Sequence, residues 1–161
     1  MAVILALTTI MPVRSQEPTT SEDTSENARF VYSGGAAKAK RAITQTTATT
    51  LTLDGVWVTL PLSTISYIVP TGFTELFNVA FSAECRKTGG DYLRIRILDG
   101  GVAMQPYDGF QVFCSATTFA THKGNWVRRV GAGVHNLTVQ FYQGIGSATI
   151  DDWTFELVVY D

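Results

Sequence analysis

Residues 136–142 read NLTVQFY and residues 153–160 read WTFELVVY, and these two stretches indicate the fold class most clearly. In both, every second side chain is apolar and most of the side chains between them are polar. Successive side chains of a β-strand point to opposite faces of the sheet. Each stretch therefore predicts a strand that buries one face only, which is typical of antiparallel sheets.

The same period of two extends back to Ile43, with turn residues between the apolar runs. Asp54-Gly55 is a sequence typical of hairpin turns, so we expect the runs on either side of it to pair. The pattern predicts an all-β antiparallel two-sheet sandwich over residues 42–161. A jelly roll is favoured over an immunoglobulin-like Greek key, and the order of the strands stays open. The roughly ten expected strands cover residues 44–53, 56–60, 66–69, 75–85, 92–98, 102–107, 110–115, 119–130, 134–142 and 148–160.

Length and charge exclude several classes of protein. The 161 residues suit one domain, and only 16% of them are charged. The formal net charge of −2 supplies no overall positive field, so we expect no nucleic-acid partner. The longest apolar run falls short of the roughly 20 residues that cross a bilayer, so we expect no membrane span.

The N-terminal region differs in composition from the rest. Residues 1–15 contain an apolar run as long as the core of a signal peptide, although no basic residue precedes it. We expect a signal peptide there, with a retained N-terminal arm as the alternative. Residues 16–41 are acidic and then basic and predict a flexible linker. This organisation favours a secreted or cell-surface protein.

The two cysteines fall at inward-facing positions of separate predicted strands. Cys85 shares its parity with the apolar set that begins at Phe77, and Cys114 with Phe110 and Val112. Two buried thiols in an exported chain are expected to oxidise, and the resulting disulfide would contribute about 3 to 4 kcal/mol in the chain-entropy model. Two unlinked core cysteines are the alternative.

Four motifs occur in order along the domain: FSAEC at 81–85, FCS at 113–115, GVHNLTVQ at 133–140 and IDDW at 150–153. Together they resemble a group of exported bacterial β-sandwich proteins of jelly-roll type without an assigned activity. The closing part also resembles the last strands of jelly-roll carbohydrate-binding modules and, more loosely, complement-C1q/tumour-necrosis-factor-like heads. The resemblance implies a secreted binding or assembly module, and the last group forms trimers.

The residues give no sign of catalysis. The two histidines, His122 and His135, lie in no catalytic motif, and no metal-binding or phosphate-binding motif is present. We therefore expect no enzyme activity and no cofactor. Calcium at Asp151 and Asp152 is the one metal hypothesis, although adjacent strand side chains point apart and the early acidic cluster of the binding modules is missing.

Outward-facing aromatic and arginine side chains are the candidate ligand-binding groups, because sugar rings stack on exposed aromatic faces and arginine supplies forked donors. The same residues suit a subunit interface, which we favour. We expect a non-catalytic structural, self-assembling or adhesive module that forms a homo-oligomer, with a trimer as one form and a glycan or cell surface as partner. A carbohydrate-binding module and a virion decoration or fibre protein are the alternatives. The ligand-binding candidates are Trp57, Tyr92, Arg94, Arg96 and Trp126.

Overall fold

The computed structural model describes residues 36–106 and 111–161, which belong to one compact unit, Gly34–Asp161. The expected signal peptide or arm at 1–15, and most of the linker at 16–41, lie outside the described residues. The first strand begins at Ala39, three residues before the expected start of the sandwich. Residues 39–41, expected to belong to the linker, are therefore part of a sheet.

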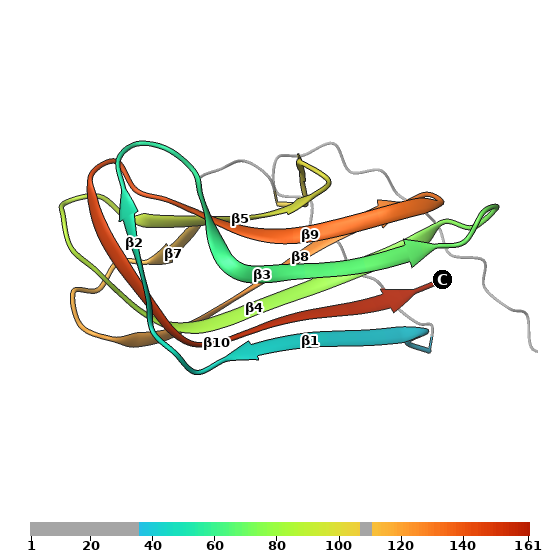
Figure 1. The fold of residues 1–161 in the computed structure, drawn as a ribbon, viewed down its shortest axis with the longest axis horizontal. Coiled ribbons are helices and arrows are strands. Elements are labelled where there is room, and N and C mark those ends of the chain that lie inside the picture. The colour runs from blue at the N-terminus through green and yellow to red at the C-terminus, as the bar shows by residue number, and fades with distance from the viewer. Residues whose placement is uncertain (1–35, 107–110) are drawn as a thin grey trace, which may run out of the picture. The chain divides into compact units, whose positions relative to one another are not determined.

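The described residues form two antiparallel five-stranded sheets (Figure 1). Sheet A has the order β1 (Ala39–Gln45), β10 (Gly146–Tyr160), β4 (Glu75–Lys87), β8 (Ala120–Val130), and β2 (Thr49–Leu53) also pairs with β10. Sheet B has the order β3 (Val58–Val69), β9 (Gly133–Tyr142), β5 (Leu93–Asp99), β6 (Val102–Ala103), and β7 (Val112–Cys114) also pairs with β5. The all-β sandwich is confirmed. The choice of a jelly roll over a Greek key stays a prediction.

Buried and outer side chains alternate along the strands in the same way as apolar and polar residues alternate in the sequence. On the long strands of both sheets, every second side chain lies in the core and its neighbours lie on the outside. This confirms the inward faces that the sequence predicts: Leu93, Ile95 and Ile97 on β5, Leu137, Val139 and Phe141 on β9, and Trp153, Phe155, Leu157 and Val159 on β10.

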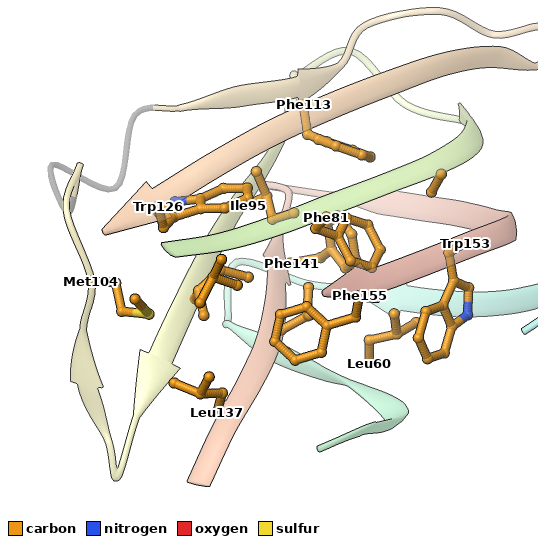
Figure 2. Packing of buried hydrophobic residues seen from close by; sticks show 14 of the residues in the cluster. Leu60, Phe81, Ile95, Met104, Phe113, Trp126, Leu137, Phe141, Trp153 and Phe155 are labelled. Atoms are coloured by element: carbon orange, nitrogen blue, oxygen red, sulfur yellow. The ribbon is translucent and has the colours of Figure 1, made fainter. Parts of the chain in front are cut away.

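The core between the sheets is centred on Phe81 of β4 (Figure 2). Its ring centroid lies 6.0 Å from that of Trp153 and 6.3 Å from that of Phe155, both in sheet A. It lies 5.5 Å from Phe113 and 5.9 Å from Phe141, both in sheet B. These distances suit edge-on and tilted ring packing, so one side chain links the inner faces of both sheets.

The hairpin expected at Asp54-Gly55 is wrong. The strand before it, β2, pairs with β10 in sheet A, and the strand after it, β3, pairs with β9 in sheet B. The turn therefore carries the chain from one sheet to the other. Gly55 has a φ of 71°, which supplies the left-handed conformation that the local sequence pattern indicates, but turn residues do not say which strand each neighbour pairs with.

The expected strands 56–60 and 66–69 are parts of one strand, β3, which contains a bulge between Thr59 and Thr64. Leu62 has a φ of 64° at this bulge, after a proline that cannot donate a ladder hydrogen bond. The Ser63 hydroxyl donates to the Leu60 carbonyl at 2.7 Å and accepts from the Val139 amide at 3.2 Å. One buried side chain thus replaces the hydrogen bonds that the bulge interrupts.

A second bulge bends β10 between Asp151 and Thr154, where Asp152 has a φ of 41°. The bend explains why the expected strand 44–53 is divided in two. β1 pairs with residues 153–159 of β10, and β2 pairs with residues 146–150. Each of the two short strands follows one straight half of the bent strand.

Charged groups gather where β1, β3 and β4 lie near one another. The Lys38 ammonium lies 2.6 Å from the buried carboxylate of Glu75 and 3.2 Å from Asp161. These two carboxylates raise the pKa of Lys38. Partial burial, and then the negative charge of Glu75, raise the pKa of Tyr67.

Removal of the Ser63 hydroxyl tests whether the bulge in β3 depends on it. We expect Ser63→Ala to lower the free energy of unfolding by about 1–3 kcal/mol, because it leaves a buried amide and a buried carbonyl without partners. Urea unfolding measures this. Ser66→Ala is the control, since that exposed hydroxyl donates to the Asn136 side chain and to no buried backbone group among the described residues, and we expect a change within about 0.5 kcal/mol. Equal losses in the two variants would contradict the role given to Ser63.

The raised pKa values of Tyr67 and Lys38 predict a loss of stability in alkali. Their contribution is complete below their ordinary values, 10.0 and 10.5, and is lost as the pH rises past these values. Urea unfolding between about pH 8 and 11 should show the decline, and Tyr67→Phe should reduce its slope. Tyr92→Phe, at an exposed tyrosine, is the control. An unchanged slope in Tyr67→Phe would exclude that tyrosine as a source.

Candidate functional site

Aromatic rings and guanidinium groups gather on the outer face of sheet B, at the end where β3 begins and β9 ends. The ring centroids of Trp57 and Tyr142 lie 5.4 Å apart. The Arg96 guanidinium carbon lies 4.1 Å from the Trp57 ring centroid, and that of Arg94 lies 5.5 Å from the Tyr142 centroid. We call these four residues the platform. Each arginine lies within the distance at which a cation is attracted to an aromatic face.

Sheet register places the platform residues side by side. Arg94 of β5 is the partner of Tyr142 on β9, and Arg96 is the partner of Gln140. Gln140 in turn is the partner of Thr59 on β3, two residues after Trp57. Because side chains at i and i+2 of a strand share a face, all these groups lie on the outer side of sheet B.

Gln140 fixes the orientation of Arg96. The Nε and one terminal nitrogen of Arg96 donate to Gln140 Oε1 at 2.9 and 2.7 Å, and Gln140 Nε2 donates to the Thr59 hydroxyl at 3.0 Å. Partial burial lowers the pKa of Arg96. The guanidinium group is thereby held against the Trp57 ring by two hydrogen bonds from one side chain.

The rim of the platform is less tightly built. Tyr92 immediately precedes β5 and is 53% exposed. The carboxylate of Asp91 accepts from the Tyr92 amide at 2.7 Å and lies 3.9 Å from Arg94. Val112 of β7, the partner of Arg94, is 49% exposed on the other side. An aromatic group and an apolar group therefore flank the arginines.

The structure brings together three of the five predicted ligand-binding residues, Trp57, Arg94 and Arg96, and places Tyr92 at their rim. Sequence reasoning missed the roles of Gln140 and Thr59. The outward parity of Gln140 was visible in the 136–142 pattern, but its partner on the next strand depends on register, which parity does not give.

The fifth candidate, Trp126, is a correction. Its indole is fully buried in the core, so it offers no stacking face to a ligand (Figure 2). The alternation on β8 places Gly124, Trp126 and Val130 inside, and Gly124 leaves room for the ring. The cost of this position is an indole N–H without a hydrogen-bond partner.

A methyl group at Gly124 tests the packing of Trp126. A Cβ there would lie 2.9 Å from Trp126 Cζ3 and closer still to Cη2. We expect Gly124→Ala to lower the free energy of unfolding by about 1–3 kcal/mol, because the indole has to shift in a filled core. Gly131→Ala is the control, with no atom within 4 Å of its new methyl group. Thermal or urea unfolding would contradict this packing if the two variants were equally stable.

Asp151 and Asp152, the calcium candidates, lie at the bulge of β10. One carboxylate oxygen of Asp151 accepts from the Asp152 amide at 3.0 Å, and Asp152 is exposed. Among the described residues, these aspartates belong to no group of three histidine, cysteine or acidic side chains close enough to hold a metal ion. A calcium site here stays a prediction.

His135 has a structural environment. Its Nδ1 lies 2.9 Å from Asp99 Oδ2 and its Nε2 lies 2.9 Å from the Gly131 carbonyl oxygen. The same carboxylate lies 3.2 Å from Arg128 of sheet A. This cluster ties β5 and β9 of sheet B to β8 of sheet A, and it occupies both ring nitrogens.

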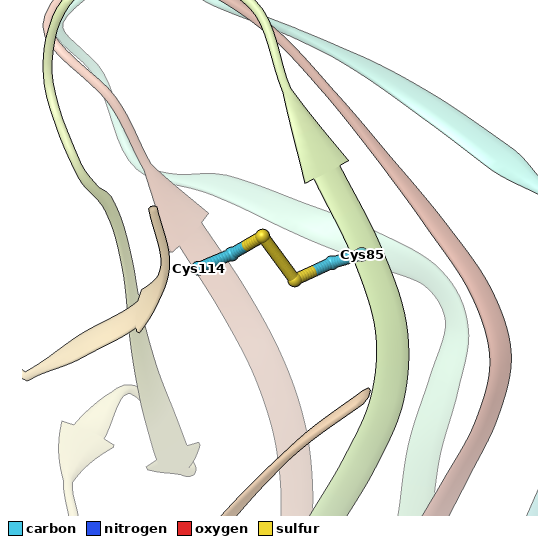
Figure 3. The surroundings of a disulfide bond; sticks show 2 residues. All are labelled: Cys85 and Cys114. Atoms are coloured by element: carbon cyan, nitrogen blue, oxygen red, sulfur yellow. A yellow bond between two sulfur atoms is a disulfide. The ribbon is translucent and has the colours of Figure 1, made fainter. Parts of the chain in front are cut away.

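The predicted disulfide is confirmed: Cys85 of β4 is bonded to Cys114 of β7, with a Cα–Cα distance of 6.4 Å (Figure 3). It joins the two sheets, and both cysteines are fully buried. The predicted inward position of Val112 is wrong, because the pairing of β7 with β5 shifts register between Leu93 and Arg94. Phe113 and Cys114 are both buried as a result. Phe110 lies outside the described residues.

Comparison with known proteins gives no family: no family model matches the chain, and no curated protein does. Several solved structures do match the chain in fold. A family 35 carbohydrate-binding module from Clostridium thermocellum is 15% identical, over 72% of this chain and 90% of that one, with a TM-score of 0.36. The sugar-binding C-terminal domain of EclA is 11% identical, over 81% and 84% of the two chains, with a TM-score of 0.30.

A third solved structure is dimeric latent PorU from Porphyromonas gingivalis, which is 13% identical over 81% of this chain, with a TM-score of 0.39. The match spans only 14% of the PorU chain. TM-scores of this size carry no argument about what this chain binds.

In the part of the chain that the structure describes, no helix has the length and apolar character needed to cross a membrane.

Proposed function

We propose that this protein is a carbohydrate-binding module that holds its glycan on the platform. The observation that carries the proposal is the Arg96 guanidinium, stacked 4.1 Å from the Trp57 ring centroid and fixed by two hydrogen bonds to Gln140. Holding a long flexible side chain in one orientation costs conformational entropy. A fixed, half-buried guanidinium on the outer face of the sheet is ready to donate to a ligand without that cost on binding.

Each part of the platform has a role in glycan recognition. The tilted pair of Trp57 and Tyr142 offers apolar ring surface, on which the C–H face of a sugar ring packs. The N–H groups of Arg96 that do not bond to Gln140 donate to sugar hydroxyl or ring oxygens, and Arg94 places a second positive charge beside Tyr142. Tyr92 extends the aromatic surface at the rim. The arrangement binds and orients a sugar through ring stacking and hydrogen bonds, and the function we propose for it is non-catalytic.

The proposed location is outside the cytoplasm, because a buried disulfide between the two sheets persists under oxidising conditions. Self-assembly is the other candidate function. It draws on a different part of sheet B, where Ile68 and Val134 are cross-strand partners and are 66% and 67% exposed. That surface and the platform are separable by mutation.

A glycan array followed by titration calorimetry tests the proposal. We expect the wild-type protein to bind at least one class of glycan, and Trp57→Ala to weaken binding at least about tenfold through loss of stacking. Gln140→Ala should also weaken binding, because it removes the two hydrogen bonds that fix the orientation of the Arg96 guanidinium.

The chain offers a matched control in Arg86 and Phe119, an arginine 4.8 Å from an exposed aromatic ring outside the platform. Phe119→Ala should leave glycan binding unchanged. Silence of the wild-type protein on all glycans, or equal losses in Phe119→Ala and Trp57→Ala, would overturn the proposal. Ile68→Ala should leave glycan binding unaltered.

A further inference from the structure

One ring nitrogen of His122 lies beside the disulfide, and none of these three residues belongs to the platform. His122 is the partner of Ala83 on β4, two residues before Cys85, so β8 and β4 direct His122 and Cys85 to the same side of sheet A. Cys114 reaches the same place from β7 of sheet B. The two sulfur atoms and the histidine nitrogen all lie within 4.8 Å of one another.

The surroundings of His122 differ from those of His135. Both nitrogens of His135 have acceptor partners, whereas His122 Nε2 is buried and has no hydrogen-bond partner. The ring of His122 packs against Phe113, with centroids 5.6 Å apart. A buried nitrogen without a hydrogen-bond partner is destabilising, so the burial of this ring beside the disulfide calls for a physical reason.

We propose that reduction of the disulfide turns Cys85, Cys114 and His122 into a three-ligand site for a zinc ion. Zinc binds cysteine sulfur at about 2.3 Å and histidine nitrogen at about 2.0 Å in a tetrahedral arrangement, which separates ligand atoms by roughly 3.5–4 Å. Ligand atoms that already lie within 4.8 Å reach this geometry through movements of about 1 Å. Water takes the fourth position.

The chemistry balances with a dithiol as reductant. The dithiol gives two electrons and two protons to the Cys85–Cys114 bond, which yields two thiols, and the dithiol becomes a disulfide. Zinc then displaces both thiol protons to solvent and binds the neutral imidazole. In the oxidised protein neither sulfur carries the charge that zinc requires. The disulfide and the metal site are therefore mutually exclusive states of the same two residues.

Access to the buried sulfur atoms needs only a local opening. Cys114 ends β7, a strand of three residues, and the next residue, Ser115, is exposed. Short strands with few ladder hydrogen bonds open at a lower free energy than the core of a sheet. A reductant and then a metal ion can reach this corner while the sheets stay packed.

Cobalt titration of the full chain tests the site, because Co²⁺ occupies zinc sites and is coloured there. The protein is reduced with a phosphine, which gives two electrons to the disulfide and becomes a phosphine oxide by taking the oxygen atom of water. The two protons of that water go to the two sulfur atoms, and the reduced protein is kept free of dissolved oxygen. We expect one Co²⁺ per chain, with thiolate-to-cobalt absorption in the near ultraviolet and tetrahedral bands in the visible, both abolished by added Zn²⁺. The oxidised protein should give no such bands.

Substitutions on β8 distinguish a three-ligand site from metal binding by the two cysteines alone. His122→Ala should weaken cobalt binding at least about tenfold, since it removes one of three ligands. Lys123→Ala is the matched control, because Lys123 follows His122 on β8 and its side chain is exposed. This variant should bind cobalt as the wild type does. Equal affinity of His122→Ala and wild type, or no cobalt bands in the reduced wild type, would overturn the proposal.

Thermal unfolding of the reduced protein gives an independent measurement. Zn²⁺ should raise the melting temperature of the reduced wild type and not that of reduced His122→Ala, because only the folded wild type presents all three ligands. If reduction unfolds the chain, Zn²⁺ should restore its β-sheet circular dichroism. A reduced chain that Zn²⁺ neither stabilises nor refolds would also overturn the proposal.

Discussion

Packing of aromatic rings around Phe81 holds the inner faces of the two sheets together. The ring of this β4 residue contacts Trp153 and Phe155 of its own sheet and Phe113 and Phe141 of the other. Aromatic rings of this size bury large apolar areas and pack with little free volume. Because one face of each sheet is committed to this layer, polar and functional groups are left to the outer faces, to the strand ends and to the bulges.

The position of the platform on the outer face of sheet B follows from the packing of the inner face. Phe141 points into the core and its neighbour Tyr142 points outward, so the packing of one fixes the position of the other. A slip of one residue between β9 and β5 would reverse both, which the core forbids. The outer face of sheet B thus inherits rigidity from the inner face. That rigidity allows a glutamine on one strand to hold an arginine on the next in a single orientation against a tryptophan.

Sequence reasoning failed where pairing is not local. The turn at Asp54-Gly55 was recognised as a turn, but it connects two sheets, because β2 finds a better partner in β10 than in the strand that follows. Trp126 was expected on the outer face of β8, but its ring lies in the core, in the space that a side chain at position 124 would otherwise fill. The division of residues 44–53 into two strands comes from a bend in β10, about a hundred residues later in the chain.

The all-β class, the inward faces of β5, β9 and β10 and the inward position of Cys85 could be predicted from the sequence, because they follow from the alternation of side chains along one strand. Cys114 is buried as expected, but the alternation expected around it is wrong, since Val112 is exposed and Phe113 is buried. Only the tertiary structure decided which strands are neighbours and in what register. It thereby brought together Trp57, Arg96 and Gln140, and placed His122 beside the disulfide. The physical reason is that alternation is a property of each strand alone, whereas register depends on hydrogen bonds and core packing between segments far apart in the chain.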